Sequence, residues 1–216
     1  MAYVQVQTLV DTDRRLVTKR VNEGTTETNA LVVNAAALSY AMSTLTTAAS
    51  TQNFRVGEVV NSTSGGTATV QDVTNSTSVI LIDATGTFNN SDTITGTSSG
   101  RTRTQSGALA ARTKAINVNR ILYNIHGSLS TKIRLEWEGT GGGANNRTIA
   151  TLSGGGIFEL DTYGFRANNT ANSPTQNIIL TTLNWDANSH YTLYLDVSKT
   201  AGYEPPYYDR NTNGGY

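Results

Sequence analysis

Apolar and polar residues alternate along much of the second half of the chain. In residues 131–138, Ile133, Leu135 and Trp137 lie on one side of an extended chain, and charged residues lie on the other. In residues 190–198, tyrosine, leucine and valine recur at every second position. Successive side chains of a strand point to opposite faces, so this period of two predicts strands with one face on a core. Trp137 is therefore expected to be a core residue.

Six such runs follow one another, separated by residues that favour turns: 115–125, 131–138, 147–152, 156–161, 177–183 and 190–198. Short strands at this spacing are typical of an all-β fold, and we expect an antiparallel, jelly-roll-like β-sandwich. The first fifty residues add strands at 16–21 and 30–33 and an edge strand or arm at 3–7. Residues 35–45 carry apolar side chains at helical spacing, which predicts a short helix.

An internal repeat interrupts this pattern. When Phe54 is aligned with Phe88, residues 54–70 and 88–104 share Phe, Thr, Ser and Gly at equivalent positions, with an offset of 34 residues. Glu58 and Asp92 match in kind. Each copy has the pattern of a strand, a Ser/Gly turn and a second strand, so the repeat predicts a small β module.

The repeat sets the expected domain boundaries. Residues 51–104 form an inserted β module of four or five strands, with residues 78–83 as its central strand. Residues 1–50 and 105–200 form the sandwich, and residues 201–216 form a C-terminal arm. So short a module has little room for a core of its own, so we expect it to pack on its host or on a neighbouring subunit.

The composition of the chain disfavours some classes of function. The 16 Lys and Arg balance the 16 Asp and Glu, so no basic field exists to hold phosphate backbones, and a nucleic-acid role is disfavoured. Cysteine is absent, which excludes disulfides. The N-terminus lacks the pattern of a signal peptide, and no apolar run approaches the ~20 residues of a membrane span. We expect no membrane association.

The residues that most often carry chemistry are sparse. His126 and His190 are the only histidines, and they do not form a zinc pattern, so we expect surface or capping residues. Asp11 and Asp13 flank a threonine, and we expect them to begin a turn.

The second carboxylate pair is Glu136 and Glu138, which alternate with Lys132 and Arg134 and predict a solvated polar face. The glycine runs 139–143 and 154–156 lead into no predicted helix, which excludes a phosphate loop. We predict no catalytic, cofactor-binding or metal-binding residue, and hence no enzyme.

Aromatic residues are the better candidates for an interaction site. Tyrosine is favoured at interfaces because its apolar ring carries a polar tip. We expect the C-terminal arm to dock on a neighbouring subunit through Tyr203, Tyr207, Tyr208 and Tyr216, the alternative being a disordered tail. Trp185 lies among Asn and Asp residues in a predicted loop, and it could stack on a sugar as in a carbohydrate-binding module.

Residues 10–40 and 115–198 resemble structural proteins of tailed bacteriophages. The segments that carry the resemblance are DTDRRLVTK, IRLEWEG, NSPTQNIILTT and YTLYLDVSK. The module 51–104 is similar to segments that recur in virion and tail proteins of marine phages. The resemblance covers most of the chain, and its motifs are dispersed and low in complexity.

The resemblance implies a non-enzymatic virion protein. We expect a decoration or cement protein that stabilises the head through contacts with the major capsid protein or other virion subunits. A homo-oligomer, such as a trimer, would suit this role, and the chain would be assembled into the virion in the host cytoplasm. The alternatives are a tail, neck, collar or fibre-associated protein and, from another class, a carbohydrate-binding module.

Overall fold

The computed structural model describes residues 2–112, 114–140, 143–160, 165–166 and 175–203. The chain forms two compact units, and each is described by itself. The first unit comprises Met1–Leu38 and Lys114–Ala201, and the second comprises Ser39–Thr113 and Gly202–Tyr216. These units differ from the predicted domains, whose boundaries lay at residues 50 and 105.

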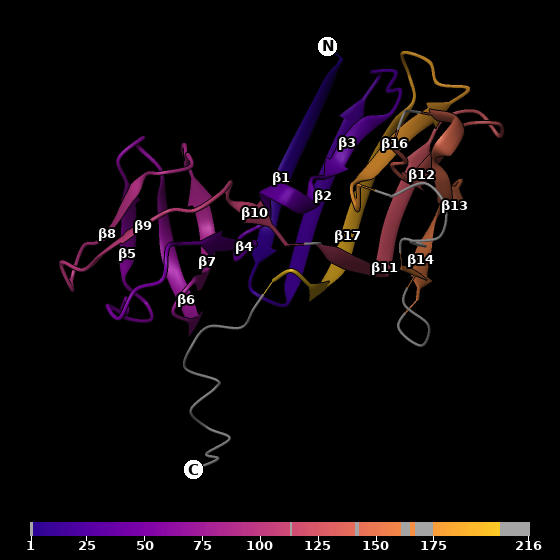
Figure 1. The fold of residues 1–216 in the computed structure, drawn as a ribbon. Coiled ribbons are helices and arrows are strands. Elements are labelled where there is room, and N and C mark those ends of the chain that lie inside the picture. The colour runs from indigo at the N-terminus through magenta and orange to yellow at the C-terminus, as the bar shows by residue number, and fades with distance from the viewer. Residues whose placement is uncertain (1, 113, 141–142, 161–164, 167–174, 204–216) are drawn as a thin grey trace. The chain divides into compact units, whose positions relative to one another are not determined.

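The first unit contains two antiparallel sheets (Figure 1). The larger sheet has the order β1 (Tyr3–Asp11), β2 (Arg15–Glu23), β17 (His190–Ala201), β11 (Ala115–His126) and β14 (Gly155–Glu159), with β15 (Phe165–Arg166) also paired to β11. The smaller sheet has the order β13 (Arg147–Leu152), β12 (Lys132–Trp137), β16 (Ile178–Leu183) and β3 (Ala30–Val33).

The alternation seen in the sequence builds the core of this unit. Tyr191, Leu193, Leu195 and Val197 of β17 are buried at every second position. On β12 the buried set is Ile133, Leu135 and Trp137, as the pattern predicted. The all-β class and the antiparallel sheets are thus confirmed, and a jelly-roll connectivity stays a prediction.

The second unit is one sheet of seven strands (Figure 1). Its order is β10 (Ala110–Ala111), β4 (Met42–Thr46), β7 (Ser78–Thr85), β6 (Thr67–Asn75), β5 (Val59–Ser62), β8 (Thr93–Gly96) and β9 (Thr102–Thr104). The predicted strand at 78–83 is β7, which lies between β4 and β6.

This sheet closes on itself. Directly after β4, Thr47 forms a β-bridge with Gln105, which directly follows β9. The amide of Ala48 donates to the carbonyl of Thr104 at 2.8 Å, and the amide of Ser106 donates to that of Thr46 at 2.8 Å. These bonds join the two sides of the sheet, so the second unit is a small barrel.

The barrel has a core of its own. Nine buried apolar side chains form one cluster: Leu45, Phe54, Val60, Ala68, Val70, Val79, Leu81, Phe88 and Ile94. The expectation that the module has little core of its own was therefore wrong. Eight of the nine residues lie in the predicted module 51–104, and Leu45 of β4 is the ninth. Residues 42–48 and 105–111, which had been assigned to the sandwich, complete the barrel.

The expected helix at 35–45 was also wrong. Ala35–Ala37 form a single 3-10 turn, capped by the side chain of Asn34, and Met42–Thr46 form β4. The segment is short and contains no strong helix cap beyond Asn34. Pairing with β7 and β10 gives its backbone groups a better partner than an isolated helix would.

The repeat appears in the barrel as a local two-fold symmetry. Strands β5 and β8 are the equivalent strands of the two copies, and they pair antiparallel with each other. Asn61 lies opposite Thr95, its own equivalent in the second copy. The amide of Thr63 donates to the carbonyl of Thr93, and the amide of Thr97 donates to that of Val59, which is the same bond repeated.

The matched carboxylates obey the same symmetry and link the copies in both directions. Glu58 of the first copy accepts bonds from the hydroxyls of Ser98 and Ser99 in the second, each at 2.9 Å. Asp92 of the second copy accepts bonds from the hydroxyls of Thr63 and Ser64 in the first, at 3.0 and 2.7 Å. The repeat therefore folds as two hairpins that hold each other.

Candidate interaction surface

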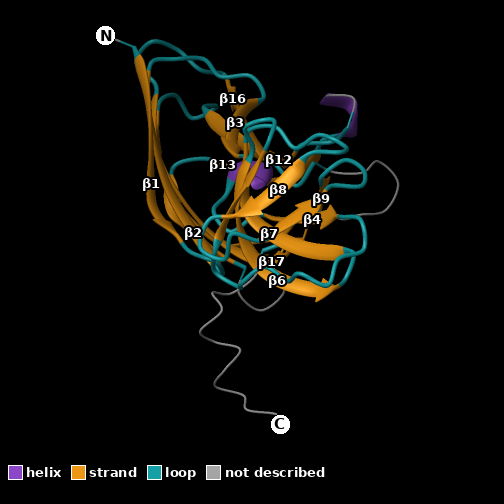
Figure 2. Ribbon diagram, turned by 60° about the vertical axis from the view of Figure 1, so that its left-hand side comes forward, coloured by secondary structure: helices purple, strands orange, loops and turns teal. Residues whose placement is uncertain are grey.

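Strand β1 forms one rim of the larger sheet in the first unit (Figure 2). Within the part of the chain that the structure describes, β1 pairs with β2 and with no second strand. Seven of its nine residues are exposed, and Val6 exposes 52% of its surface. The other exposed large apolar residues of the strand are Tyr3, Leu9 and Val10. The backbone groups of β1 that point away from β2, together with four apolar side chains, thus lie along one exposed edge.

The apolar character of β1 has a structural origin in its register. Val6 lies opposite Arg20, and Thr8 lies opposite Thr18. Arg20 and Thr18 are buried against the core, whereas Val6 and Thr8 on the same face are exposed. The face of the sheet that is buried at β2 therefore continues onto β1, where its side chains are exposed.

Charge does not protect this edge. Proteins commonly place lysine, proline or inward-pointing charges on edge strands to prevent pairing with other chains. Residues 3–10 contain none of these, and one bulge between Thr8 and Val10 is the only irregularity of the β1–β2 pairing. Asp11, at the end of the strand, forms an ion pair with the buried ammonium of Lys199 and anchors β1 to the sheet.

The opposite rim of the same sheet is also apolar. On β14, Ile157 exposes 60% of its surface and Phe158 is exposed beside it. Leu122 of β11 lies opposite Ile157 and is exposed as well. Leu129, in the loop after β11, is fully exposed. Exposed apolar side chains therefore lie on both rims of one sheet.

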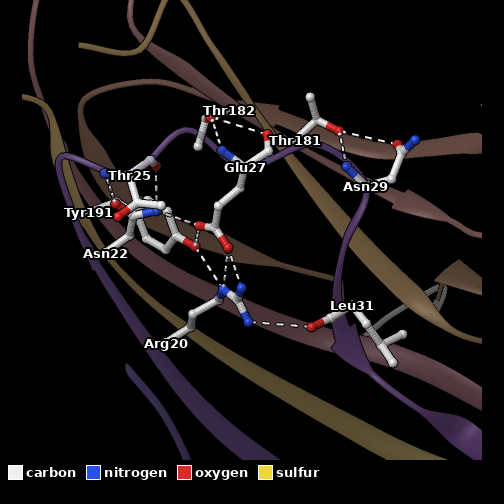
Figure 3. A network of polar contacts seen from close by, with 9 residues as sticks. All are labelled: Arg20, Asn22, Thr25, Glu27, Asn29, Leu31, Thr181, Thr182 and Tyr191. Atoms are coloured by element: carbon white, nitrogen blue, oxygen red, sulfur yellow. Dashed lines mark hydrogen bonds and ion pairs between the residues drawn. The ribbon is translucent and has the colours of Figure 1, made fainter. Parts of the chain in front are cut away.

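The frame that holds β2 in place is a buried polar network (Figure 3). Arg20 of β2 forms an ion pair with Glu27, and both side chains are almost fully buried. The hydroxyl of Tyr191 donates to Glu27 at 2.6 Å and accepts a bond from Arg20 at 3.0 Å. Asn22 donates to the second carboxylate oxygen of Glu27 at 2.5 Å. Every polar group in this centre is matched by another.

The same network links Glu27, in the segment before β3, to four strands. The amide of Glu27 donates to the hydroxyl of Thr182 on β16 at 2.8 Å, and Arg20 donates to the carbonyl of Leu31 on β3 at 3.3 Å. The carboxylate of Glu27 is thus bound by residues of β2 and β17 in one sheet, and the backbone of Glu27 and the side chain of Arg20 reach β16 and β3 of the other, as Figure 3 shows. These contacts hold the two sheets of the first unit together.

The electrostatics of the network support this role. Burial raises the pKa of Tyr191 far above its ordinary value, and its hydrogen bond to Glu27 raises it further. Burial alone would lower the pKa of Arg20, but the bonds to Glu27 and Tyr191 outweigh it and raise that pKa. Tyr191 is therefore neutral and Arg20 charged at any physiological pH.

The two histidines meet on the outer face of the larger sheet. His126 and His190 lie opposite each other on β11 and β17, with stacked rings whose centroids are 4.5 Å apart. Both are exposed, as expected for surface residues. Glu23 lies opposite His190 and borders a shallow depression with residues 187–190. No three histidine, aspartate or glutamate side chains among the described residues gather as a metal would require.

Two of the aromatic residues expected at an interface lie in the described part of the chain. Tyr203 is buried, with 8% of its surface exposed, and its backbone bridges Ala41 in the second unit. Trp185 is half-buried and meets the ring of Tyr191 edge-on at 5.6 Å. Its indole nitrogen is buried, with no hydrogen-bond partner among the described residues. Neither ring is presented openly. Tyr207, Tyr208 and Tyr216 lie outside the described residues.

The expected polar face of β12 was wrong for one residue. Glu136 is buried, with 6% of its surface exposed, and it forms an ion pair with Arg134 at 3.1 Å. The register shift between Leu135 and Glu136 lies on β13, where Ile149 is the extra residue, so β12 keeps its alternation and Glu136 is buried on the face opposite Trp137. The sequence shows no signal for this burial.

At the end of β1, the predicted turn around Asp11 and Asp13 is organised by the residue between them. The hydroxyl of Thr12 accepts bonds from the amides of Arg14 and Arg15.

Comparison with protein-family models, with curated proteins and with solved structures found no match. Among the described residues, no helix is long and apolar enough to cross a membrane. The exposed apolar rims of the larger sheet in the first unit are the feature on which a proposal about function can rest.

Proposed function

We propose that this chain is a non-enzymatic structural subunit of a tailed-bacteriophage virion, of the kind that decorates or cements the head. The observation that carries the proposal is the pair of exposed apolar rims, β1 and β14, on one sheet of the first unit. The kind of particle comes from the resemblance of residues 10–40 and 115–198 to phage structural proteins.

The mechanism is mechanical. Contacts made through the rims bury apolar surface between neighbouring subunits, and a partner that binds the folded state stabilises the assembly by mass action. The partners are the major capsid protein or other virion subunits, together with further copies of this chain. The balance of charges supports this role, because many copies can pack densely without mutual repulsion.

The second unit takes a different part in the proposal. Its sheet is closed and its core is complete, so it needs no neighbour to cover an edge. We therefore assign the anchoring contacts to the first unit and leave the barrel free for a variable role on the particle.

Copy number in purified particles tests this proposal. Quantitative mass spectrometry against the major capsid protein should find the chain in hundreds of copies, as expected for the head shell. About six to eighteen copies would place it at the neck, baseplate or fibre instead, because those parts follow low rotational symmetry. Absence of the chain from washed particles would overturn the virion assignment.

The C-terminal arm is tested separately. Removal of residues 204–216 keeps Tyr203 and its bridge to Ala41, so the barrel is left intact. If the arm docks on a neighbouring subunit, the shortened chain should show reduced occupancy in particles. Unchanged occupancy would reject the arm and leave the rims of the sheet as the anchoring surface.

A further inference from the structure

We propose that β1 pairs antiparallel with β1 of a second copy of this chain, around a two-fold axis that passes through Val6. The two larger sheets would then form one continuous sheet across the dimer. This inference rests on the proposed assembly role, since it names the first partner of the exposed rim. The observations that carry it are the free edge of β1, its exposed apolar side chains and the lack of charge between Tyr3 and Val10.

The sequence of β1 is complementary to itself in this register. With Val6 opposite Val6, Tyr3 lies opposite Leu9, Val4 opposite Thr8 and Gln5 opposite Gln7. Each side chain thus lies opposite one of the same type: apolar opposite apolar, β-branched opposite β-branched and amide opposite amide. Cross-strand pairs of these types stabilise a sheet. Tyr3, Val6 and Leu9 are three of the exposed apolar residues of β1, and each gains an apolar partner.

Other registers satisfy the strand less well. A shift by one residue would place side chains of the core-facing side opposite those of the outer side, which a sheet does not allow. Centring the axis on Gln7 would place Tyr3 opposite Asp11 and Gln5 opposite Leu9. The bulge at Leu9 ends regular pairing, so the dimer strand extends from Tyr3 to Leu9.

A second copy fits this edge because pairing brings no like charges together. The nearest charged residue, Asp11, lies beyond the paired stretch and is already bound to Lys199. A contact between identical surfaces around a two-fold axis is closed after two subunits. The structure therefore favours a dimer through β1 over the trimer expected from the sequence.

A single cysteine tests the axis directly, because the natural chain contains none. In Val6→Cys the two thiols would lie directly opposite each other, within the Cα separation that a disulfide requires. Mild oxidation of the purified full chain should give a covalent dimer of twice the 23.1 kDa chain mass. Leu129→Cys, fully exposed in the same unit but off the strand, is the matched control and should remain uncross-linked.

The register has its own test. Val4→Cys alone should not cross-link, because the two copies of residue 4 would lie about 13 Å apart along the strands. A mixture of Val4→Cys and Thr8→Cys chains should form the mixed dimer. Cross-linking of Val4→Cys with itself would contradict the Val6 axis.

A charge on the axis should separate the dimer. Val6→Lys places two ammonium groups opposite each other and should raise the dimer dissociation constant at least about 100-fold. Val6→Thr keeps the branched side chain and should change it by no more than about fivefold. Sedimentation equilibrium measures both constants, and circular dichroism checks that the Val6→Lys chain is folded.

The outcomes are distinct. A wild-type chain that stays monomeric up to about 100 μM, a concentration well above ordinary dimer affinities, would overturn the inference, as would a dimer that Val6→Lys leaves intact. Both experiments use the purified chain, whereas the virion role is tested by copy number in particles. Failure of one is therefore distinguishable from failure of the other.

Discussion

The larger sheet of the first unit has an open edge, whereas the sheet of the second unit is closed. In the first unit, β1 offers nine residues of edge with exposed apolar side chains. In the second unit, the corresponding edges are the three residues of β9 and the two of β10, and the segment between them closes on the end of β4. The larger sheet of the first unit ends in an unpaired strand edge, and the sheet of the second unit closes into a barrel.

This difference shows where the molecule can be extended. A closed sheet has no backbone groups left to template another chain, whereas a long uncharged edge strand is a ready pairing site. In the barrel, Arg103 of β9 strengthens the closure by donating to the carbonyls of Gln52 and Ser76 and to the side chain of Asn53. The barrel is thus complete as a single copy, and we assign the proposed assembly surface to the first unit.

The largest expected effect comes from breaking the frame behind the open edge. Arg20 lies opposite Val6, and Arg20→Met leaves Glu27 as a buried carboxylate without its cation. The first unit should lose about 3–5 kcal/mol of unfolding free energy. Denaturant unfolding followed by tryptophan fluorescence measures it, because Trp137 and Trp185, the only tryptophans, both lie in the first unit.

The matched control is an exposed arginine of the same strand. Arg15 forms a two-point ion pair with Asp196, and Arg15→Met should cost less than about 1 kcal/mol because the arginine is exposed to solvent. Equal losses for Arg15→Met and Arg20→Met would contradict the structural role of the buried network.

The next effect concerns the closed unit and leaves the open edge untouched. A Cβ on Gly96 would come within 2.7 Å of the carboxyl carbon of Glu58 and within 2.6 Å of the Ser99 hydroxyl. Gly96→Ser should therefore destabilise the barrel by about 1–3 kcal/mol. Far-UV circular dichroism would show an earlier transition for the barrel, with unchanged tryptophan fluorescence.

The repeat itself supplies the rescue. In the first copy the position equivalent to Gly96 is Ser62, and it lies near the shorter Asp92. Adding Glu58→Asp to Gly96→Ser reproduces that arrangement and should restore part of the loss. A double variant no more stable than Gly96→Ser alone would show that the two copies are not equivalent in this respect.

A smaller effect should appear in acid. Burial raises the pKa of Glu58, but hydrogen bonds from the amides of Arg55 and Ser99 and from two serine hydroxyls outweigh it and lower that pKa. The amide of Asn89 and the hydroxyl of Ser64 lower the pKa of Asp92. Both carboxylates therefore stabilise the barrel fully above pH 4.5, the ordinary pKa of glutamate, and progressively less as the pH falls through their lowered values.

Barrel unfolding measured between pH 6 and pH 2 should thus show stability that declines in acid. Glu58→Gln should flatten part of this decline, since glutamine does not titrate there. A pH profile of Glu58→Gln identical to that of the wild type would mean that this carboxylate does not contribute.

Much of the fold could be predicted from alternation alone. The period of two identified β11, β12 and β17 and their buried faces, because one side of each strand meets a core. The repeat identified the two hairpins. The closure of the barrel could not be predicted, because it depends on pairing between Thr47 and Gln105, residues distant in sequence whose contact leaves no periodic signal.

The exposed apolar rim at β1 was harder to predict. Residues 3–7 were expected to form an edge strand or arm, and they begin β1. The interface itself, however, was predicted at the tyrosines near the C-terminus. The signal for the rim was present as eight consecutive residues, Tyr3 to Val10, without charge or proline. Its meaning depends on β1 being at an edge, and that position follows from the long-range pairing of β2 with β17.

Hydrogen exchange tests the contrast between the two edges most directly. Amides of the Tyr3–Leu9 segment should exchange more slowly in the wild-type chain than in Val6→Lys at the same concentration, because pairing between copies protects the outward amides. Amides of β9, Thr102–Thr104, should exchange equally in both chains. Equal exchange of Tyr3–Leu9 in the two chains would contradict the account, since it would mean that the open edge is not used for assembly.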